Sequence, residues 1–207
     1  MSCQIRTNRI EPCKNNVGGI DSIYFVNYGD IKDIKYNSTR SIITSVGGSP
    51  AAFKYNAIGS SSYSEKIKSN SNNGTTFYEQ TLKITLSKLS EEDFVNVAEL
   101  AKGRPNIIIQ DNNGNLFLSG ADFGSNMTDS DVVTGESMSD LSGYVLKFKA
   151  LEKTSAKFID KVSEGQLGVD ALSRLGFNIA YNQAGWDYYY RVIEDEGIVE
   201  SLINVKV

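Results

Sequence analysis

One stretch decides the fold: residues 74–103, which read GTTFYEQTLKITLSKLSEEDFVNVAELAKG. Apolar and polar side chains alternate over residues 75–88. One side would carry Tyr78, Gln80, Leu82, Ile84 and Leu86, and the other Phe77, Glu79, Thr81, Lys83, Thr85 and Ser87. This period of two predicts a long strand with one covered face, as in an antiparallel sheet.

An amphipathic helix is expected directly after this strand. Ser90 is a suitable N-cap for the backbone N–H of Asp93, and acidic residues at 91–93 suit the positive end of the helix. Gly103 is a suitable left-handed stop. Because Phe94, Val97, Ala98 and Ala101 fall on one stripe at helical spacing, we expect that stripe to pack on a sheet.

Several shorter segments supply this sheet. β-Branched and aromatic residues bounded by turn residues predict strands at 20–28, 31–36, 41–46, 51–59, 105–110, 115–119 and 143–151. The run Asp111-Asn112-Asn113-Gly114 predicts a hairpin between two of them, because Asn and Gly tolerate the positive φ angles that tight turns require.

Residues 60–76 are rich in Ser, Asn and Gly and leave three alternatives open. The first alternative is that these residues form the two arms of a polar hairpin with its tip at 69–74. The second is a protruding loop that orders against a neighbouring copy, and the third is an unstructured surface loop. As candidate interface residues we single out Lys66, Lys68, Asn72 and Asn73.

Residues 121–141 are predicted to form an acidic loop. The segment contains no Lys or Arg, and its acidic residues are Asp122, Asp129, Asp131, Glu136 and Asp140. Asp129-Ser130-Asp131 lacks the glycine and distal glutamate of an EF-hand, so a solvated loop is expected and not a calcium site.

Composition narrows the function classes. A formal charge of −4 argues against binding nucleic acid by charge neutralisation. The absence of histidine excludes Ser-His-Asp and Cys-His triads, and we expect neither enzyme activity nor a cofactor. With no apolar run that could span a bilayer and no signal-peptide core, we expect a soluble protein made in a cytoplasm. Cys3 and Cys13 match no zinc or redox spacing and are expected to be reduced thiols.

Beyond residue 152 the character of the chain changes. Residues 154–162 have a helical pattern, and 169–175 predict a short helix that ends at Gly176. The aromatic residues Trp186, Tyr188 and Tyr190, with Tyr189 between the last two, belong either to the protein's own core or to an interface. We therefore expect an arm at 1–19, a β domain at 20–152 and a docking extension at 153–207.

Several strings in residues 1–152 resemble structural proteins of tailed bacteriophages. They are Pro12-Cys13-Lys14, Val17-Gly18-Gly19-Ile20, Tyr24-Phe25-Val26-Asn27-Tyr28, Phe53-Lys54-Tyr55, the run 74–82, Gly103-Arg104-Pro105, Asp111-Asn112-Asn113-Gly114-Asn115 and the run 133–144. The set is similar to tail tube and head–tail connector ring subunits from phages of Bacteroides hosts, including crAss-like phages.

The resemblance implies a mainly β fold: an antiparallel sandwich or distorted barrel of the tail-tube type, flanked by one helix. Residues 154–207 depart from a plain tube subunit, and we expect them to form a C-terminal α+β extension. It also implies hexameric or dodecameric rings around a DNA channel in the virion tail or neck, assembled in the host cytoplasm beside other tail, neck or portal proteins. No membrane partner is expected.

Three functional hypotheses follow. If Asp129, Asp131, Glu136 and Asp140 lined the channel, they would repel DNA phosphates and let the genome slide without specific binding. The main alternative is a carbohydrate- or host-surface-binding β module that uses Trp186 and the neighbouring tyrosines. The third is a glycan-cleaving enzyme with a carboxylate pair from Asp129, Asp131 and Glu136.

Overall fold

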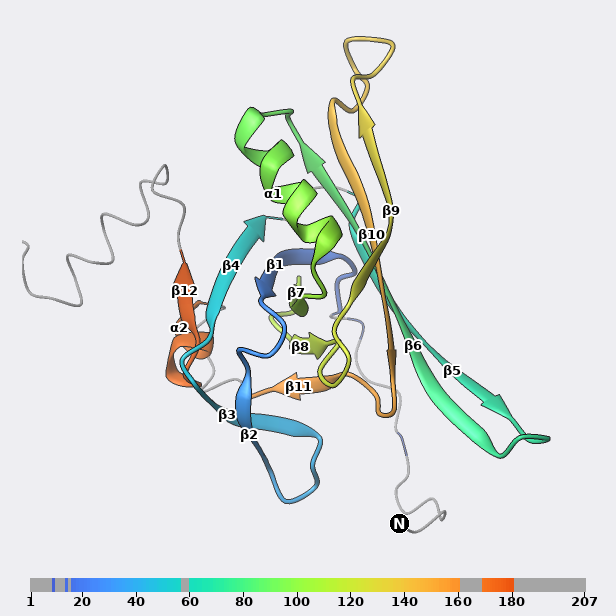
Figure 1. Cartoon of the computed structure of the whole chain (residues 1–207), viewed down its shortest axis with the longest axis vertical. Coiled ribbons are helices and arrows are strands. Elements are labelled where there is room, and N and C mark those ends of the chain that lie inside the picture. Colours follow the sequence, from blue (N-terminus) through green and yellow to red (C-terminus); the bar gives the residue numbers. More distant parts are fainter. Residues whose placement is uncertain (1–8, 10–13, 15, 57–59, 161–168, 181–207) are drawn as a thin grey trace, which may run out of the picture.

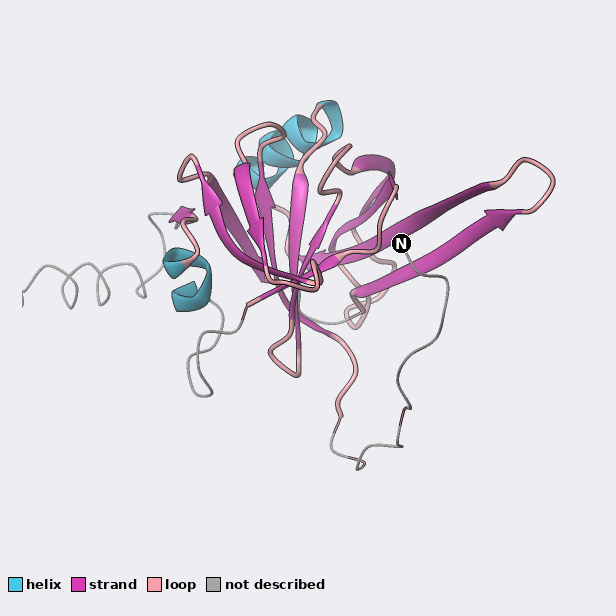
Figure 2. Cartoon of the chain, turned by 90° about the horizontal axis from the view of Figure 1, so that it is seen from below, coloured by secondary structure: helices cyan, strands magenta, loops and turns pink. Residues whose placement is uncertain are grey.

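The computed structural model describes residues 9, 14, 16–56, 60–160 and 169–180. It contains two β-sheets with helix α1 (Glu91–Lys102) packed beside them (Figures 1 and 2). The mainly β fold class with one packed helix is thereby confirmed, and the larger sheet curls into a half-barrel.

The larger sheet has eight strands. Their order across the sheet is β12 (Asn178–Ala180), β4 (Ala51–Asn56), β1 (Ile20–Val26), β7 (Asn106–Asp111), β8 (Leu116–Ser119), β11 (Lys157–Ile159), β3 (Ile42–Gly47) and β2 (Lys32–Tyr36). The β7–β8 hairpin is confirmed: the Asp111 carboxylate accepts hydrogen bonds from the backbone N–H of Asn113 (2.9 Å) and Asn115 (2.6 Å). Gly114 takes the positive φ of +70° that the turn needs.

The smaller sheet has four strands and is antiparallel throughout. Its order is β5 (Ser62–Asn70), β6 (Thr75–Ser87), β10 (Gly143–Glu152) and β9 (Asn126–Val133). β6 is the long alternating strand of the sequence, and Gln80, Leu82 and Ile84 are buried on its predicted inner side.

Two apolar clusters hold the sheets together. Successive residues of β1 point to opposite faces, so Ile23 and Phe25 enter the cluster between the two sheets, while Tyr24 and Val26 enter the cluster inside the curl. Both faces of the larger sheet are therefore buried at its centre, which explains why β1 and β7 are almost continuously apolar.

Helix α1 begins as expected and differs in two details. The Ser90 hydroxyl accepts a hydrogen bond from the backbone N–H of Asp93 at 3.1 Å. Gly103 is extended (φ −87°, ψ 179°) and not left-handed, because the chain must run at once through Pro105 into β7. The helix presents Val97 and Leu100 to the core, whereas Phe94 is 61% exposed.

The predicted stripe on α1 is thus right at Val97, which is buried, and wrong at Phe94, which is exposed, because it is rotated about the helix axis. Ala101, like Phe94, is exposed. Leu100, which packs against the core, and the half-buried Asn96 lie outside the predicted stripe, because spacing alone does not say where a helix axis lies above a sheet.

Two further predictions are corrected. Residues 121–141 are not a loop throughout, since 126–133 form β9 and pair with β10. An edge strand has one neighbour and can keep polar side chains on both faces, so the apolar alternation is absent. Residues 154–160, the described part of the helical pattern predicted at 154–162, are not helical: β11 pairs with β8 and β3 and buries Ile159.

The larger sheet continues past residue 152, the predicted end of the β domain. β11 and β12 are two of its strands, and the short helix α2 (Val169–Arg174) confirms the helix predicted there. The described part of the predicted extension adds five side chains to the core: Ile159, Leu172, Leu175, Phe177 and Ile179.

Candidate functional site

A hairpin of β5 and β6 projects from the body of the protein (Figures 1 and 2). Pairing runs from Ser62 opposite Lys83 to Asn70 opposite Thr75, which confirms the hairpin alternative for residues 60–76. At the tip, the Asn70 side chain accepts hydrogen bonds from the backbone N–H of Asn72 (3.0 Å) and Asn73 (3.4 Å). The predicted interface residues Lys66, Lys68, Asn72 and Asn73 are all exposed on this hairpin.

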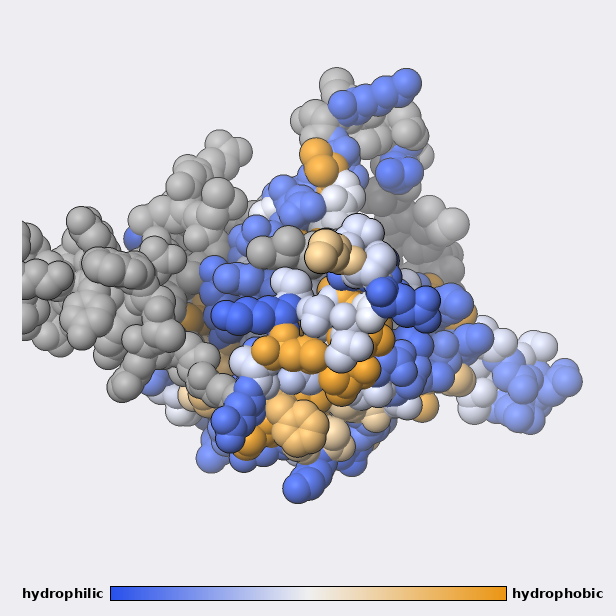
Figure 3. Space-filling model, turned by 90° about the horizontal axis from the view of Figure 1, so that it is seen from above, coloured by the Kyte–Doolittle hydropathy of each residue, from blue (hydrophilic) through white to orange (hydrophobic). Residues whose placement is uncertain are grey.

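The outer half of the hairpin is uncovered on both faces. Ile67 points to the same face as the buried residues of the sheet and is 65% exposed, while Phe77 on the opposite face is 39% exposed. Figure 3 shows the hairpin at the right as a mostly hydrophilic projection. An isolated two-stranded hairpin is only marginally stable in water, so a partner that covered this outer half would stabilise it.

The base of the hairpin is held firmly. The Glu65 carboxylate accepts hydrogen bonds from the Gln80 side chain (3.0 Å), the Ser155 hydroxyl (2.6 Å) and the backbone N–H of Ala156 (2.8 Å). Gln80 in turn accepts from the Ser119 hydroxyl at 2.9 Å. Burial, and secondarily the charge of Glu65, raises the pKa of Tyr63 beside it. These bonds tie the hairpin to the larger sheet.

The two end strands of the smaller sheet carry opposite charges. β5 and β9 are its edges, and no strand of the described chain pairs with their outer sides. Lys66 and Lys68 of β5 lie on the face turned away from the core, opposite Glu79 and Phe77. Asp129 and Asp131 of β9 lie on that same face, opposite Lys147 and Val145.

The aspartates therefore do not form an acidic surface of their own. Asp129 forms an ion pair with Lys147, and this hydrogen bond lowers the pKa of Asp129 and raises that of Lys147. Lys149 likewise contacts Glu79 at 3.1 Å and lowers its pKa. Lysines outnumber carboxylates on this face, which carries Lys66, Lys68, Lys83, Lys147 and Lys149 beside Glu79, Asp129 and Asp131.

The other two predicted acidic residues lie in the loop between β9 and β10. The Asp140 carboxylate accepts hydrogen bonds from the backbone N–H of Glu136 (3.1 Å) and Ser137 (2.8 Å). The bond from Ser137 is the main cause of the lowered pKa of Asp140. Asp140 thus shapes its own loop, whereas the Glu136 side chain is exposed. The remaining candidates, Trp186, Tyr188 and Tyr190, and both cysteines lie outside the described residues.

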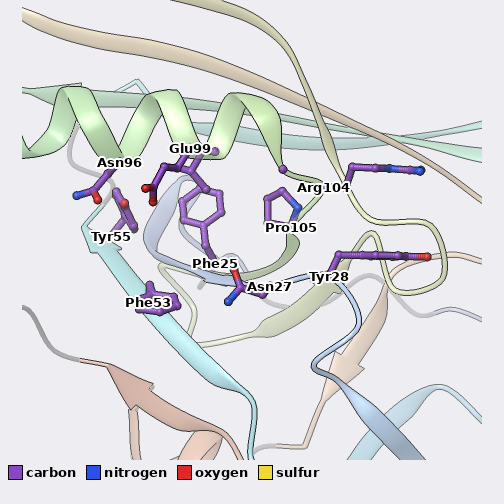
Figure 4. Close-up of a pocket in the computed structure, with 11 residues that line it drawn as sticks. Phe25, Asn27, Tyr28, Phe53, Tyr55, Asn96, Glu99, Arg104 and Pro105 are labelled. Carbon is purple, nitrogen blue, oxygen red and sulfur yellow. The ribbon is translucent and has the colours of Figure 1, made fainter.

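A pocket of about 440 Å³ lies between α1 and strands β1 and β4. Figure 4 shows Asn96 and Glu99 on α1 near the rings of Phe25, Phe53 and Tyr55. At one end of the pocket, the Arg104 guanidinium lies 5.7 Å from the Tyr28 ring centre and donates a hydrogen bond to the Phe123 carbonyl (2.7 Å). Aromatic rings beside amides and a carboxylate suit a sugar ring or a partner's side chain.

Sequence reasoning missed this pocket because its walls come from β1, β4, α1 and the turn before β7, which are far apart in the chain. Among the described residues, no three or more His, Cys, Asp or Glu side chains are grouped to hold a metal ion. No helix in that part of the chain is long and apolar enough to cross a bilayer. Comparison with protein families, curated proteins and solved structures found no match to this chain.

Proposed function

We propose that the protein is a virion structural subunit that self-associates into a ring around a DNA channel in a phage tail or neck. The observation that carries this proposal is the four-stranded antiparallel sheet, whose two edges no strand of the described residues covers. The resemblance of residues 1–152 to tail tube and connector ring subunits supplies the virion setting and assembly in a host cytoplasm.

Strand direction favours repeated head-to-tail contact. Because three successive antiparallel pairings separate β5 from β9, the two edges run in opposite directions. A rotation about an axis that runs roughly along the strands keeps the direction of each strand. A second copy placed by such a rotation therefore brings its β9 antiparallel to β5 of the first copy. Contacts of this heterologous kind close into a ring where the rotation between copies divides a full turn, and closure removes the exposed edges that otherwise invite uncontrolled pairing.

The same geometry defines the wall of the channel. One face of the smaller sheet is covered by the larger sheet and α1, so in a ring the other face would line the interior. That face carries both lysines and carboxylates, and Glu136 and Asp140 would lie beyond the end of the sheet. The channel proposed here thus has a mixed lining and differs from the purely acidic one that the sequence predicts.

A DNA-ejection assay tests the part that the carboxylates play. With Asp129, Asp131, Glu136 and Asp140 made neutral, the lysines of the lining lose their counter-charges and hold phosphate more strongly. We expect slower ejection. Passage at the wild-type rate would rule out a role for these four side chains in DNA transit.

Imaging of labelled virions tests the proposal as a whole. A tag at the exposed tip, residues 69–73, should appear in the neck or tail at a fixed axial position, with rings visible in virions or in purified protein. One axial level indicates a connector ring, and many levels indicate a tube. A label on fibres, or absent from the particle, would contradict the ring proposal.

The pocket favours one second candidate, a carbohydrate- or host-surface-binding module. Its aromatic rings, Phe53 above all, lie beside the hydrogen-bonding side chains of Asn27, Asn96 and Glu99. This function predicts binding of host glycans by protein that forms no rings, and loss of that binding in Phe53→Ala. Ring formation with no glycan binding would leave the structural role as the better account.

A further inference from the structure

We infer that the contact between copies has one register, in which Lys66 lies opposite Asp131 and Lys68 opposite Asp129 of the next copy. The inference rests on the proposed function, because it requires β5 of one subunit to meet β9 of another. It adds the residues that choose how the two edges align.

Equal spacing of the charges selects this register. Lys66 and Lys68 are consecutive positions on the outward face of β5, as Asp129 and Asp131 are on β9, so each pair is about 7 Å apart. In an antiparallel pair both lysines then face both aspartates in a single alignment. A slip of two residues keeps one pair, and a slip of one puts the lysines and the aspartates on opposite faces.

These side chains are available for such a contact. Lys66, Lys68 and Asp131 are exposed, and none of the three has an ion-pair partner among the described residues. Asp129 has Lys147 beside it and would share its carboxylate between two ammonium groups. Exposed ion pairs add little affinity, but unlike charges directly opposite one another favour one cross-strand alignment over the rest.

The opposite face of the two strands agrees with this register. Ile67 of β5 and Val132 of β9 both point to the core side and are both exposed. The inferred alignment puts Ile67 opposite Ser130 and diagonal to Val132, within reach of a cross-strand apolar contact. The contact would thus cover two exposed apolar side chains while it pairs the charges on the other face.

The register also has the stagger that a closed barrel needs. Within one subunit, Ser62, Lys83, Lys147 and Asp129 form a row straight across the four strands. The inferred contact sets Lys68, six residues beyond Ser62, opposite the next Asp129. That shift is about 20 Å along the strands, and four strands are about 19 Å wide across the sheet. The ratio of the two lengths corresponds to a strand tilt of about 45° relative to the ring axis. Strands in closed barrels tilt by roughly 35–45°.

A charge-complementation experiment tests the pairing. One variant carries Lys66→Glu and Lys68→Glu, and a second carries Asp129→Lys and Asp131→Lys. Each has like charges on both edges and should stay monomeric by sedimentation velocity under conditions where the wild type forms rings. An equimolar mixture restores opposite charges at every contact and should recover rings. Lys32→Glu with Lys35→Glu, two exposed lysines of β2, is the matched control and should assemble normally.

Cysteine crosslinking in virions or rings tests the alignment itself. With Cys3 and Cys13 replaced by Ser, Lys66→Cys with Asp131→Cys should crosslink neighbouring copies at least about tenfold faster than Lys66→Cys with Asp129→Cys, because a disulfide needs closely opposed Cα atoms. Faster crosslinking of the second pair, or rings from either charge variant alone, overturns this register and leaves the ring proposal standing. The absence of crosslinks from both pairs overturns the β5–β9 contact and the proposed assembly with it.

Discussion

At the residue scale, Glu152 is a buried carboxylate that accepts hydrogen bonds from a neighbouring turn. Its side chain is 3% exposed, and the carboxylate accepts hydrogen bonds from the backbone N–H of Asp122 (3.2 Å) and Phe123 (3.0 Å). Burial raises the pKa of Glu152, and the two N–H groups offset only part of this effect. The buried charge anchors the turn that leads from β8 to β9.

This anchor gives stability a characteristic pH dependence. The pKa of Glu152 is higher in the folded protein than in the unfolded chain, so between the two values the folded state binds more protons. The contribution of Glu152 to the free energy of unfolding should therefore fall as pH rises from about 4.3 upward through the raised pKa. Urea denaturation of wild type and Glu152→Gln across this window should give a difference curve that slopes downward. Glu99→Gln, at an exposed helix position, is the control for charge removal, and a flat curve for Glu152→Gln would contradict the assignment.

Gly143 is required where β10 begins. A Cβ atom at this position would lie 2.0 Å from the Leu86 carbonyl oxygen and 3.1 Å from the Ser87 Cα, both on the paired strand β6. Gly143→Ala should force the two strands apart and lower the free energy of unfolding by about 2–3 kcal/mol. Thermal unfolding measures the effect against Gly18→Ala, whose added methyl group meets no atom within 4 Å. Equal melting temperatures for the two variants would refute the close approach.

At the element scale, the rotation of α1 is directly testable. Val97 is buried in the cluster between the sheets, whereas Phe94 is mostly exposed. Val97→Ala should lower the free energy of unfolding by about 2 kcal/mol, and Phe94→Ala, although it removes more atoms, should change it by less than about 0.5 kcal/mol. Chemical denaturation compares the two. A comparable loss of stability in both variants would restore the stripe predicted from the sequence, which contains both residues.

Elements with a strong local signal were predictable. The alternation in β6, the Ser90 N-cap and the Asp-Asn-Asn-Gly turn each depend on neighbours in the chain, and each was found where expected. β9 and β11 were not, because an edge strand needs no apolar period and a three-residue strand is too short to show one. Their positions follow from pairing with β10, β8 and β3, which the sequence does not display.

The candidate site was predictable in part for the same reason. Composition alone singled out Lys66 and Lys68 as exposed and polar. The sequence did not predict that Asp129 and Asp131 lie on the opposite edge of the same sheet, because they join the face of Lys66 and Lys68 only when β9 pairs with β10. The Glu65 hydrogen bonds to Ser155 and Ala156 span about 90 residues of sequence, beyond the reach of any local pattern.

At the scale of the whole molecule, the uncovered hairpin should matter for assembly and not for folding. Ile67→Asp and Phe77→Asp place a charge on surfaces that water already reaches in the single chain, so the melting temperature of the monomer should stay within a few degrees of wild type. Ring formation should be lost in Ile67→Asp, because the contact would bury that charge, and kept in Phe77→Asp, because Phe77 lies on the face that would line the channel. Circular dichroism and sedimentation velocity report the two properties separately.

Val95→Asp is the matched control for these hairpin variants. Val95 is an exposed apolar residue of α1 and belongs to neither edge strand, so this variant should fold and assemble as the wild type does. If Ile67→Asp assembles as well as Val95→Asp, the hairpin is not part of the proposed contact between copies.

The anchored base of the hairpin also has a mechanical consequence. A force applied at the tip acts along β6, which is joined to β10 over ten residue pairs, and through Glu65 it reaches the turn before β11. Antiparallel strands pulled lengthwise resist in shear, so their hydrogen bonds share the load and do not open one after another. The hairpin should therefore transmit force without opening. In the proposed ring, a pull from a neighbouring copy should move the subunit as one rigid body before any strand separates.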